Sequence, residues 1–160
     1  MLKKENNIEN ESENSIKSVN LQLDYDDIPE VMRVNISAIL LDNKNNVIGV
    51  ISPSTIGNNG VISMGERLMK VNFDHISLGV KRIIIAINTN QNHLLNQVKN
   101  LTMKVMNNGS IFSYNMSKKD FPVTLISPVE FIREDNHCWS AHPLNIERQL
   151  DFDAYINQFC

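Results

Sequence analysis

Chemically reactive side chains gather near the end of this sequence, where His137, Cys138 and His142 lie close together. A thiolate beside an imidazole base can act as a nucleophile, and both residue types are preferred zinc ligands. Residues four apart on an extended strand are about 13 Å apart, too far for proton transfer between Cys138 and His142. The cluster also lacks the paired spacings of zinc motifs. We therefore expect no catalytic residues and no metal ligands here, and we interpret Cys138 as a structural cysteine beside Trp139.

Acidic and glycine-rich segments elsewhere supply weaker signals. Asp24, Asp26 and Asp27 offer oxygen ligands for calcium, but their spacing lacks the glycine and the distal glutamate of an EF-hand loop. Gly57–Gly60 lacks the lysine and the helix that follow a phosphate-binding loop. No Gly-x-Ser-x-Gly nucleophile elbow occurs. We interpret the aspartates as a solvated turn.

Positive charge is limited. The net charge is −3, and residues 1–30 hold eight acidic residues and three lysines, so the remainder is close to neutral. A chain with this balance lacks the basic footprint of a nucleic-acid-binding protein. Four cations near the predicted strands offer an anion patch, although such charges usually form a solvated face: Arg67, Lys70, Lys81 and Arg82.

The composition of the N-terminal segment predicts a disordered tail and a cytoplasmic location. Residues 1–14 are rich in glutamate, asparagine and lysine, which favours a disordered acidic tail before a single domain at 15–160. The tail has no apolar stretch of a signal peptide, and no run approaches the about 18 apolar residues of a membrane-spanning helix. We therefore expect a cytoplasmic protein without direct membrane insertion, in which Cys138 and Cys160 are free thiols.

The elements around these residues alternate as strands do. Val31–Leu41 predicts a central strand, because it alternates and then becomes wholly apolar. The turn-forming residues Asp42–Asn46 lead back into Val47–Ile51, which predicts a hairpin. Val80–Ile87 is apolar at both odd and even positions, which predicts an inner strand buried on both faces. In Gln97–Met106 apolar and polar residues alternate strictly, which predicts a half-buried strand.

Further signals complete an all-β pattern. Asn108 and Gly109 form the strongest short hairpin signal available. Apolar residues near the end fall on one helical stripe with a break at Asp151, which predicts a short helix that packs on the sheets: Ile146, Leu150, Tyr155, Ile156 and Phe159. Other strands are expected at Ile16–Leu23, Val61–Ile62, Leu68–Phe73, Ile111–Met116, Val123–Arg133 and His137–His142. Together they predict a two-sheet β-sandwich.

Several segments within residues 31–143 occur in an order and spacing typical of one family: Ser37–Asp42, Gly60–Glu66, Val71–Phe73, Val80–Ile83, Leu95–Val98, Thr124–Arg133 and Trp139–Ala141. They resemble the TerD-type domain of tellurite-resistance and stress-response proteins. Glu130 and Arg133 match by position the family's Phe-Gly-Glu-Leu-Tyr-Arg motif. The resemblance implies a β-sandwich fold, in agreement with the strand pattern.

The departures from the family concern calcium. The resemblance implies a calcium site made of acidic residues, but its two strand aspartates fall on Arg33 and Asn35, and a third becomes Glu66. The acidic loop is missing, because Arg67–Lys70 leads directly into the next strand. Calcium requires six to eight oxygens, several of them anionic. We therefore expect no calcium binding at this corner and no cofactor.

The favoured interpretation is a non-catalytic interaction module. The resemblance implies other Ter-type stress proteins as partners and, through such a partner, a place at the inner face of the membrane. The alternative is a small anion or ligand bound at the degenerate calcium corner, by Arg33, Asn35 and Glu66. A salt bridge between Arg33 and Glu66 is the simpler reading of those charges. An enzyme that uses Cys138 and His142 is the least favoured alternative.

Overall fold

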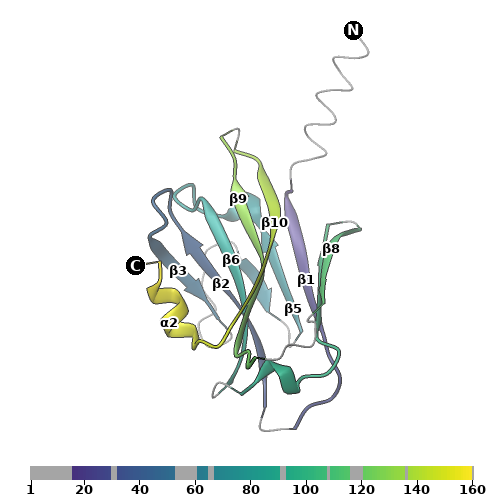
Figure 1. The fold of residues 1–160 in the computed structure, drawn as a ribbon. Helices are drawn as coiled ribbons and strands as arrows, with labels where there is room; N and C mark the ends of the chain where they lie inside the picture. Colours follow the sequence, from purple (N-terminus) through teal and green to yellow (C-terminus); the bar gives the residue numbers. More distant parts are fainter. Residues whose placement is uncertain are drawn as a thin grey trace.

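The computed structural model describes residues 16–29, 32–52, 61–64, 67–90, 93–107, 109–115, 121–135 and 137–159. Within them, ten strands form two five-stranded antiparallel sheets that face each other (Figure 1). Sheet A has the order β4-β5-β1-β7-β8. Its strands are β1 (Ser18–Asp24), β4 (Val61–Met64), β5 (Leu68–Asn72), β7 (Thr102–Met106) and β8 (Ser110–Asn115). The all-β sandwich predicted from the sequence is confirmed.

Sheet B has the order β10-β9-β6-β2-β3. Its strands are β2 (Val34–Leu41), β3 (Val47–Ile51), β6 (Arg82–Thr89), β9 (Leu125–Arg133) and β10 (Trp139–Arg148). Short helices in the described residues accompany the sheets: the 3₁₀ helices η1 (Phe73–His75) and η3 (Leu95–Gln97), and the α-helix α2 (Phe152–Asn157). None of the described helices is long and apolar enough to span a membrane.

The main core lies between the sheets and follows from strand alternation. In β1, Val19, Leu21 and Leu23 are at most 1% exposed and face sheet B, while the intervening polar residues face solvent. Phe131 of β9 is fully buried, and its ring meets Phe73 edge-on at 5.2 Å between centroids. This arrangement explains why one-sided alternation marks the strands of sheet A.

A second, smaller core lies on the outer face of sheet B. There α2 covers the centre of the sheet, beside β3 and β2 (Figure 1), and Tyr155 packs against residues of β2 and β6. Asp151 caps the helix, because its Oδ1 accepts a hydrogen bond from the N–H of Ala154 at 2.6 Å. Both faces of β2 and β6 are therefore buried, which explains their continuous apolar runs.

Two boundaries predicted from alternation are wrong. Strand β7 begins only at Thr102, because residues 95–97 form η3 and Asn100 adopts a left-handed backbone with a φ of 57°. Ile146 belongs to β10 rather than to the terminal helix, which begins at Phe152. Strand β10 continues past Pro143 through a bulge, in which Asn145 has a φ of 52°.

The hairpins predicted at Asp42–Asn46 and at Asn108–Gly109 are confirmed by the antiparallel pairing of β2 with β3 and of β7 with β8. The predicted acidic tail at residues 1–14 and the glycine-containing loop at Pro53–Gly60 lie outside the described residues. Cys138 is half-buried and Cys160 lies outside the described residues, so the two free thiols stay a prediction.

Candidate functional site

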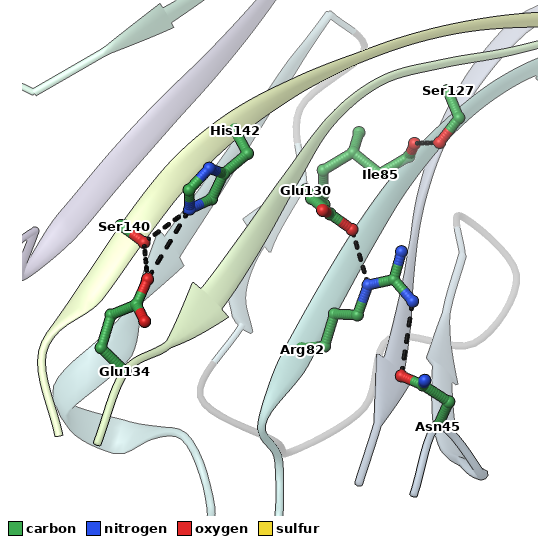
Figure 2. Close-up of polar contacts among 8 residues, drawn as sticks. All are labelled: Asn45, Arg82, Ile85, Ser127, Glu130, Glu134, Ser140 and His142. Carbon is green, nitrogen blue, oxygen red and sulfur yellow. Dashed lines mark hydrogen bonds and ion pairs between the residues drawn. The ribbon is translucent and has the colours of Figure 1, made fainter. Parts of the chain in front are cut away.

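The polar end of sheet B is built around an ion pair between two inner strands. Arg82 of β6 and Glu130 of β9 lie diagonally across the β6–β9 ladder, and Nε donates to Oε2 at 2.6 Å (Figure 2). The Nη1 of Arg82 also donates to Oδ1 of Asn45 in the β2–β3 turn at 3.3 Å. The Glu130 side chain is 11% exposed and that of Arg82 27%. These charge-assisted bonds therefore tie two strands and the β2–β3 turn together, with the carboxylate largely buried.

Replacing Arg82 with methionine is expected to destabilise the protein by about 2–3 kcal/mol, because it leaves the more buried carboxylate of Glu130 unpaired. Urea denaturation measures the loss. Lys70→Met, which removes an exposed cation of sheet A, is the matched control and should change little. An equal loss in both variants would contradict the assignment.

A second polar cluster lies at the base of the β9–β10 turn (Figure 2). The Oγ of Ser140 donates to Oε1 of Glu134 at 2.7 Å and lies 2.8 Å from Nε2 of His142. The same Nε2 is 3.7 Å from the Glu134 carboxylate. In a catalytic triad the acid binds the other ring nitrogen, so that the imidazole can take the serine proton. Here one nitrogen meets both groups, and the cluster does not form such a relay.

Cys138, the cysteine of the enzyme and metal hypotheses, lies beside this cluster at the β9–β10 turn. The carbonyl of the half-buried Cys138 accepts the N–H of Glu134 at 2.8 Å, which closes the turn before β10. The Nε2 of His142 contacts Ser140 and Glu134. His137 lies in the turn with a left-handed φ of 65°. Among the described residues, no three histidine, cysteine or acidic side chains converge as metal ligands would.

The aspartates before β2 are also engaged by protein groups. Asp24 lies 3.7 Å from Nη1 of Arg67, and Oδ2 of Asp26 accepts a hydrogen bond from Asn100 at 3.0 Å. The guanidinium of Arg67 stacks on Tyr25, with its carbon 3.8 Å from the ring centroid. Asp24 ends β1, and these contacts join the exposed segment that follows it to residues distant in the chain.

A surface pocket of about 440 Å³ opens beside the Arg82–Glu130 pair. It is lined by residues of the β2–β3 turn, the start of β6 and the end of β9 with the turn that follows, within the segments 42–45, 81–82, 132–135 and at His137. Backbone hydrogen bonds bring these segments together, because the N–H of Lys81 binds the carbonyl of Leu41 and the carbonyl of Lys81 accepts the N–H of Arg133. Of the four cations proposed as an anion patch, the structure brings Lys81 and Arg82 to this pocket.

Arg133 forms the rigid wall of the pocket. Only 9% of the residue is exposed, and its guanidinium lies 4.7 Å from the centroid of the Trp139 ring. Its Nη1 and Nη2 donate to the carbonyls of Ser77 and Ile76, both at 3.3 Å. Burial lowers the pKa of Arg133 from its ordinary value, yet arginine stays charged in proteins. The side chain thus carries a fixed positive charge between η1 and the β9–β10 turn.

The degenerate calcium corner lies at the opposite end of β2. Arg33 is exposed and Asn35 half-buried, and Asn35 pairs with Asn88 of β6 in the ladder. The N–H of Arg33 donates to Oδ1 of Asn90 at 2.6 Å. Glu66, the third residue of the predicted corner, lies outside the described residues.

The donor set of this corner does not fit calcium. Its described side chains are one guanidinium and neutral amides, whereas calcium takes six to eight oxygens of which several are anionic. The anion hypothesis at Arg33, Asn35 and Glu66 stays a prediction, because one of its three residues is not described.

Sequence reasoning missed a buried contact between the two sheets. The hydroxyl of Tyr114 on β8 donates a short hydrogen bond to Oε1 of Glu147 on β10, and both residues are at least 91% buried. Burial and the neighbouring carboxylate raise the pKa of Tyr114. The helical stripe that begins at Ile146 hides this contact, because it assigns Glu147 to a helix. If the segment is instead taken as a strand, the alternation of side chains points Glu147 inward, toward sheet A.

Comparison with known proteins bears on the fold. The sequence matches no protein-family model and no curated protein. Among solved structures, a homologue of telluride resistance protein (TerD), SCO6318 from Streptomyces coelicolor A3(2), superposes with a TM-score of 0.75 at 15% identity. The match covers 88% of this chain and 95% of that protein. This protein has a TerD-like fold.

A second solved structure supports the same assignment. The protein of unknown function SAV2460 matches the TerD-like chain with a TM-score of 0.78 at 14% identity, over 89% of this chain and 95% of the other. Within the fold, the two residues that matched the family motif by position have structural contacts. Glu130 holds Arg82 across two strands, and Arg133 packs on Trp139.

Proposed function

We propose that this protein is a non-catalytic, TerD-like interaction module of a tellurite-resistance or stress-response system, in which calcium binding has been lost. The observation that carries the proposal is the TerD-like fold, which extends over 88% of the chain and 95% of the TerD homologue. Fold alone does not specify function, so the proposal also depends on the chemistry of the polar groups.

The polar groups support a module without catalysis. Arg82 with Glu130, and Ser140 with Glu134, bind one another across strands and turns. Ser140, His142 and Glu134 do meet, but the serine and the carboxylate share one ring nitrogen, so the cluster lacks the order of a catalytic relay. Side chains committed to such pairs stabilise a scaffold rather than activate a substrate.

The corner at the start of β2 supports the loss of calcium. Arg33 places a cation, and Asn35 a neutral amide, where the family resemblance implies aspartates. A guanidinium repels a divalent ion, and an amide contributes a single neutral oxygen. Both changes lower calcium affinity.

The proposed partners are other Ter-type stress proteins in the cytoplasm, and through such a partner the inner face of the membrane. No described helix covers the outer face of sheet A, whereas α2 covers sheet B (Figure 1). That face carries polar side chains, two exposed lysines (Lys70 and Lys104) and two exposed apolar residues (Leu68 and Ile111). A mixed polar and apolar sheet surface of this kind suits a reversible protein interface.

The test combines genetics with affinity purification. Deleting the gene in its source organism is expected to lower survival on tellurite or under oxidative stress, and the full-length chain should restore it. Pull-down from the same cells is expected to recover a Ter-type partner. Lys70→Glu with Lys104→Glu, which reverses the charge of the open face, should reduce that recovery while the fold persists. Unchanged survival together with no recovered Ter-type protein would refute the proposal.

A further inference from the structure

We propose that the pocket formed by the segments 42–45, 81–82 and 132–137 binds a small molecule that carries a phosphate group. The site lies at the opposite end of β2 from the degenerate calcium corner, and it is independent of the proposed interaction role. Its volume of about 440 Å³ falls within the range of small-molecule sites, about 300–1,000 Å³.

Three cations line this pocket, and two of them, Lys81 and Arg82, retain donors for a ligand. The ammonium of Lys81 has no partner among the described residues. Arg82 uses Nε for Glu130 and Nη1 for Asn45, which leaves Nη2 for a ligand. Arginine and lysine together are the usual donors to phosphate, arginine through its planar fork and lysine as a compact charge.

The carboxylates of the pocket are largely committed to bonds of their own. Both oxygens of Asp42 accept hydrogen bonds within its turn, from Lys44 and Asn46. The hydrogen bond from the Asn46 N–H is the main cause that holds the pKa of Asp42 below its usual value. This carboxylate therefore stays ionised and bonded within its own turn. Glu134 accepts from Ser140. Asp135 is the lining carboxylate without a described partner, and it opposes anion binding.

The donors are held in place before any ligand arrives. Arg133 is fixed by two backbone carbonyls and by the Trp139 ring, and the backbone of Lys81 is bonded on both sides to neighbouring strands. Such preorganisation lowers the entropic cost of binding. The space exceeds that of a bare phosphate ion, so the ligand has an organic part.

The test is a titration of the full-length, isotope-labelled protein followed by NMR, with ribose 5-phosphate, inorganic phosphate and ribose as probes. Ribose 5-phosphate is expected to shift amides of residues 43–45, 81–82 and 133–137 at millimolar concentration. Inorganic phosphate should bind more weakly, and ribose should not bind. Tighter binding of inorganic phosphate than of ribose 5-phosphate would overturn the inference of an organic ligand.

Three variants assign the binding to this pocket. Lys81→Gln is expected to weaken ribose 5-phosphate binding about tenfold, by loss of one close charge contact. Asp135→Asn should tighten it several-fold, because a nearby repulsive charge is removed. Lys70→Gln on sheet A is the matched control and should leave it unchanged. No amide shifts in this region with either phosphate probe, or equal weakening by Lys70→Gln and Lys81→Gln, would overturn the proposal.

Discussion

Replacing Phe131 by alanine is expected to lower the free energy of unfolding by about 3–5 kcal/mol. Phe131 is fully buried, with 0% of its surface exposed, and its ring meets Phe73 edge-on between the sheets. Phe73 in turn stacks on Trp139 at 4.8 Å between centroids. Truncation removes one ring of this aromatic group and leaves a cavity that the two sheets cannot close without moving.

Urea denaturation followed by tryptophan fluorescence measures this loss, because Trp139 belongs to the same aromatic group. Phe121→Ala is the matched control, since Phe121 is 47% exposed and its truncation should cost less than about 1 kcal/mol. Similar losses in the two variants would contradict the placement of Phe131 at the centre of the core.

The double substitution Arg33→Asp with Asn35→Asp is expected to create calcium binding that, as we propose, the unaltered protein lacks. The change removes a cation and places two carboxylates two residues apart at the start of β2, a spacing that puts side chains on one face of extended backbone. Affinity should reach the range of weak calcium modules, with a Kd of about 10⁻⁴–10⁻³ M. Isothermal titration with calcium measures both proteins.

The control for this experiment is Arg33→Gln with Asn35→Gln. It removes the cation without adding carboxylates, and it should bind no calcium if anionic oxygens are the missing component. Micromolar calcium binding by the unaltered protein that Asn35→Ala abolishes would contradict the proposed loss. Absence of any binding by the double aspartate variant would mean that the rest of the corner has diverged as well.

A sequence pattern can persist because its residues hold the fold together, as Glu130, Arg133 and Trp139 illustrate. Glu130 pairs with Arg82, and Arg133 is held between Trp139 and two backbone carbonyls. The Arg82–Glu130 pair and the bonds from Arg133 to the carbonyls of Ile76 and Ser77 join segments that are distant in the chain. Residues of this kind maintain a fold whether or not a metal or partner is bound, so their presence is evidence about structure before it is evidence about function.

The strands and hairpins of this protein could be predicted because their causes are local. Alternation with period two in β1 and β7, and turn residues such as Asp42–Asn46, depend on a few neighbouring positions. The limits of this reasoning were equally local. Asn100 adopts a left-handed backbone that shortens β7, and asparagine permits that conformation without requiring it.

The sequence by itself determined an all-β sandwich, its principal hairpins, the burial of β2 and β6 on both faces, and the replacement of two expected acidic ligands by Arg33 and Asn35. Only the tertiary structure decided which strands share a sheet. It also joined Arg82 to Glu130 and Tyr114 to Glu147, and assembled the pocket around Lys81. The reason is physical: periodicity and turn propensity act between neighbours, whereas these contacts depend on which segments pair across long loops.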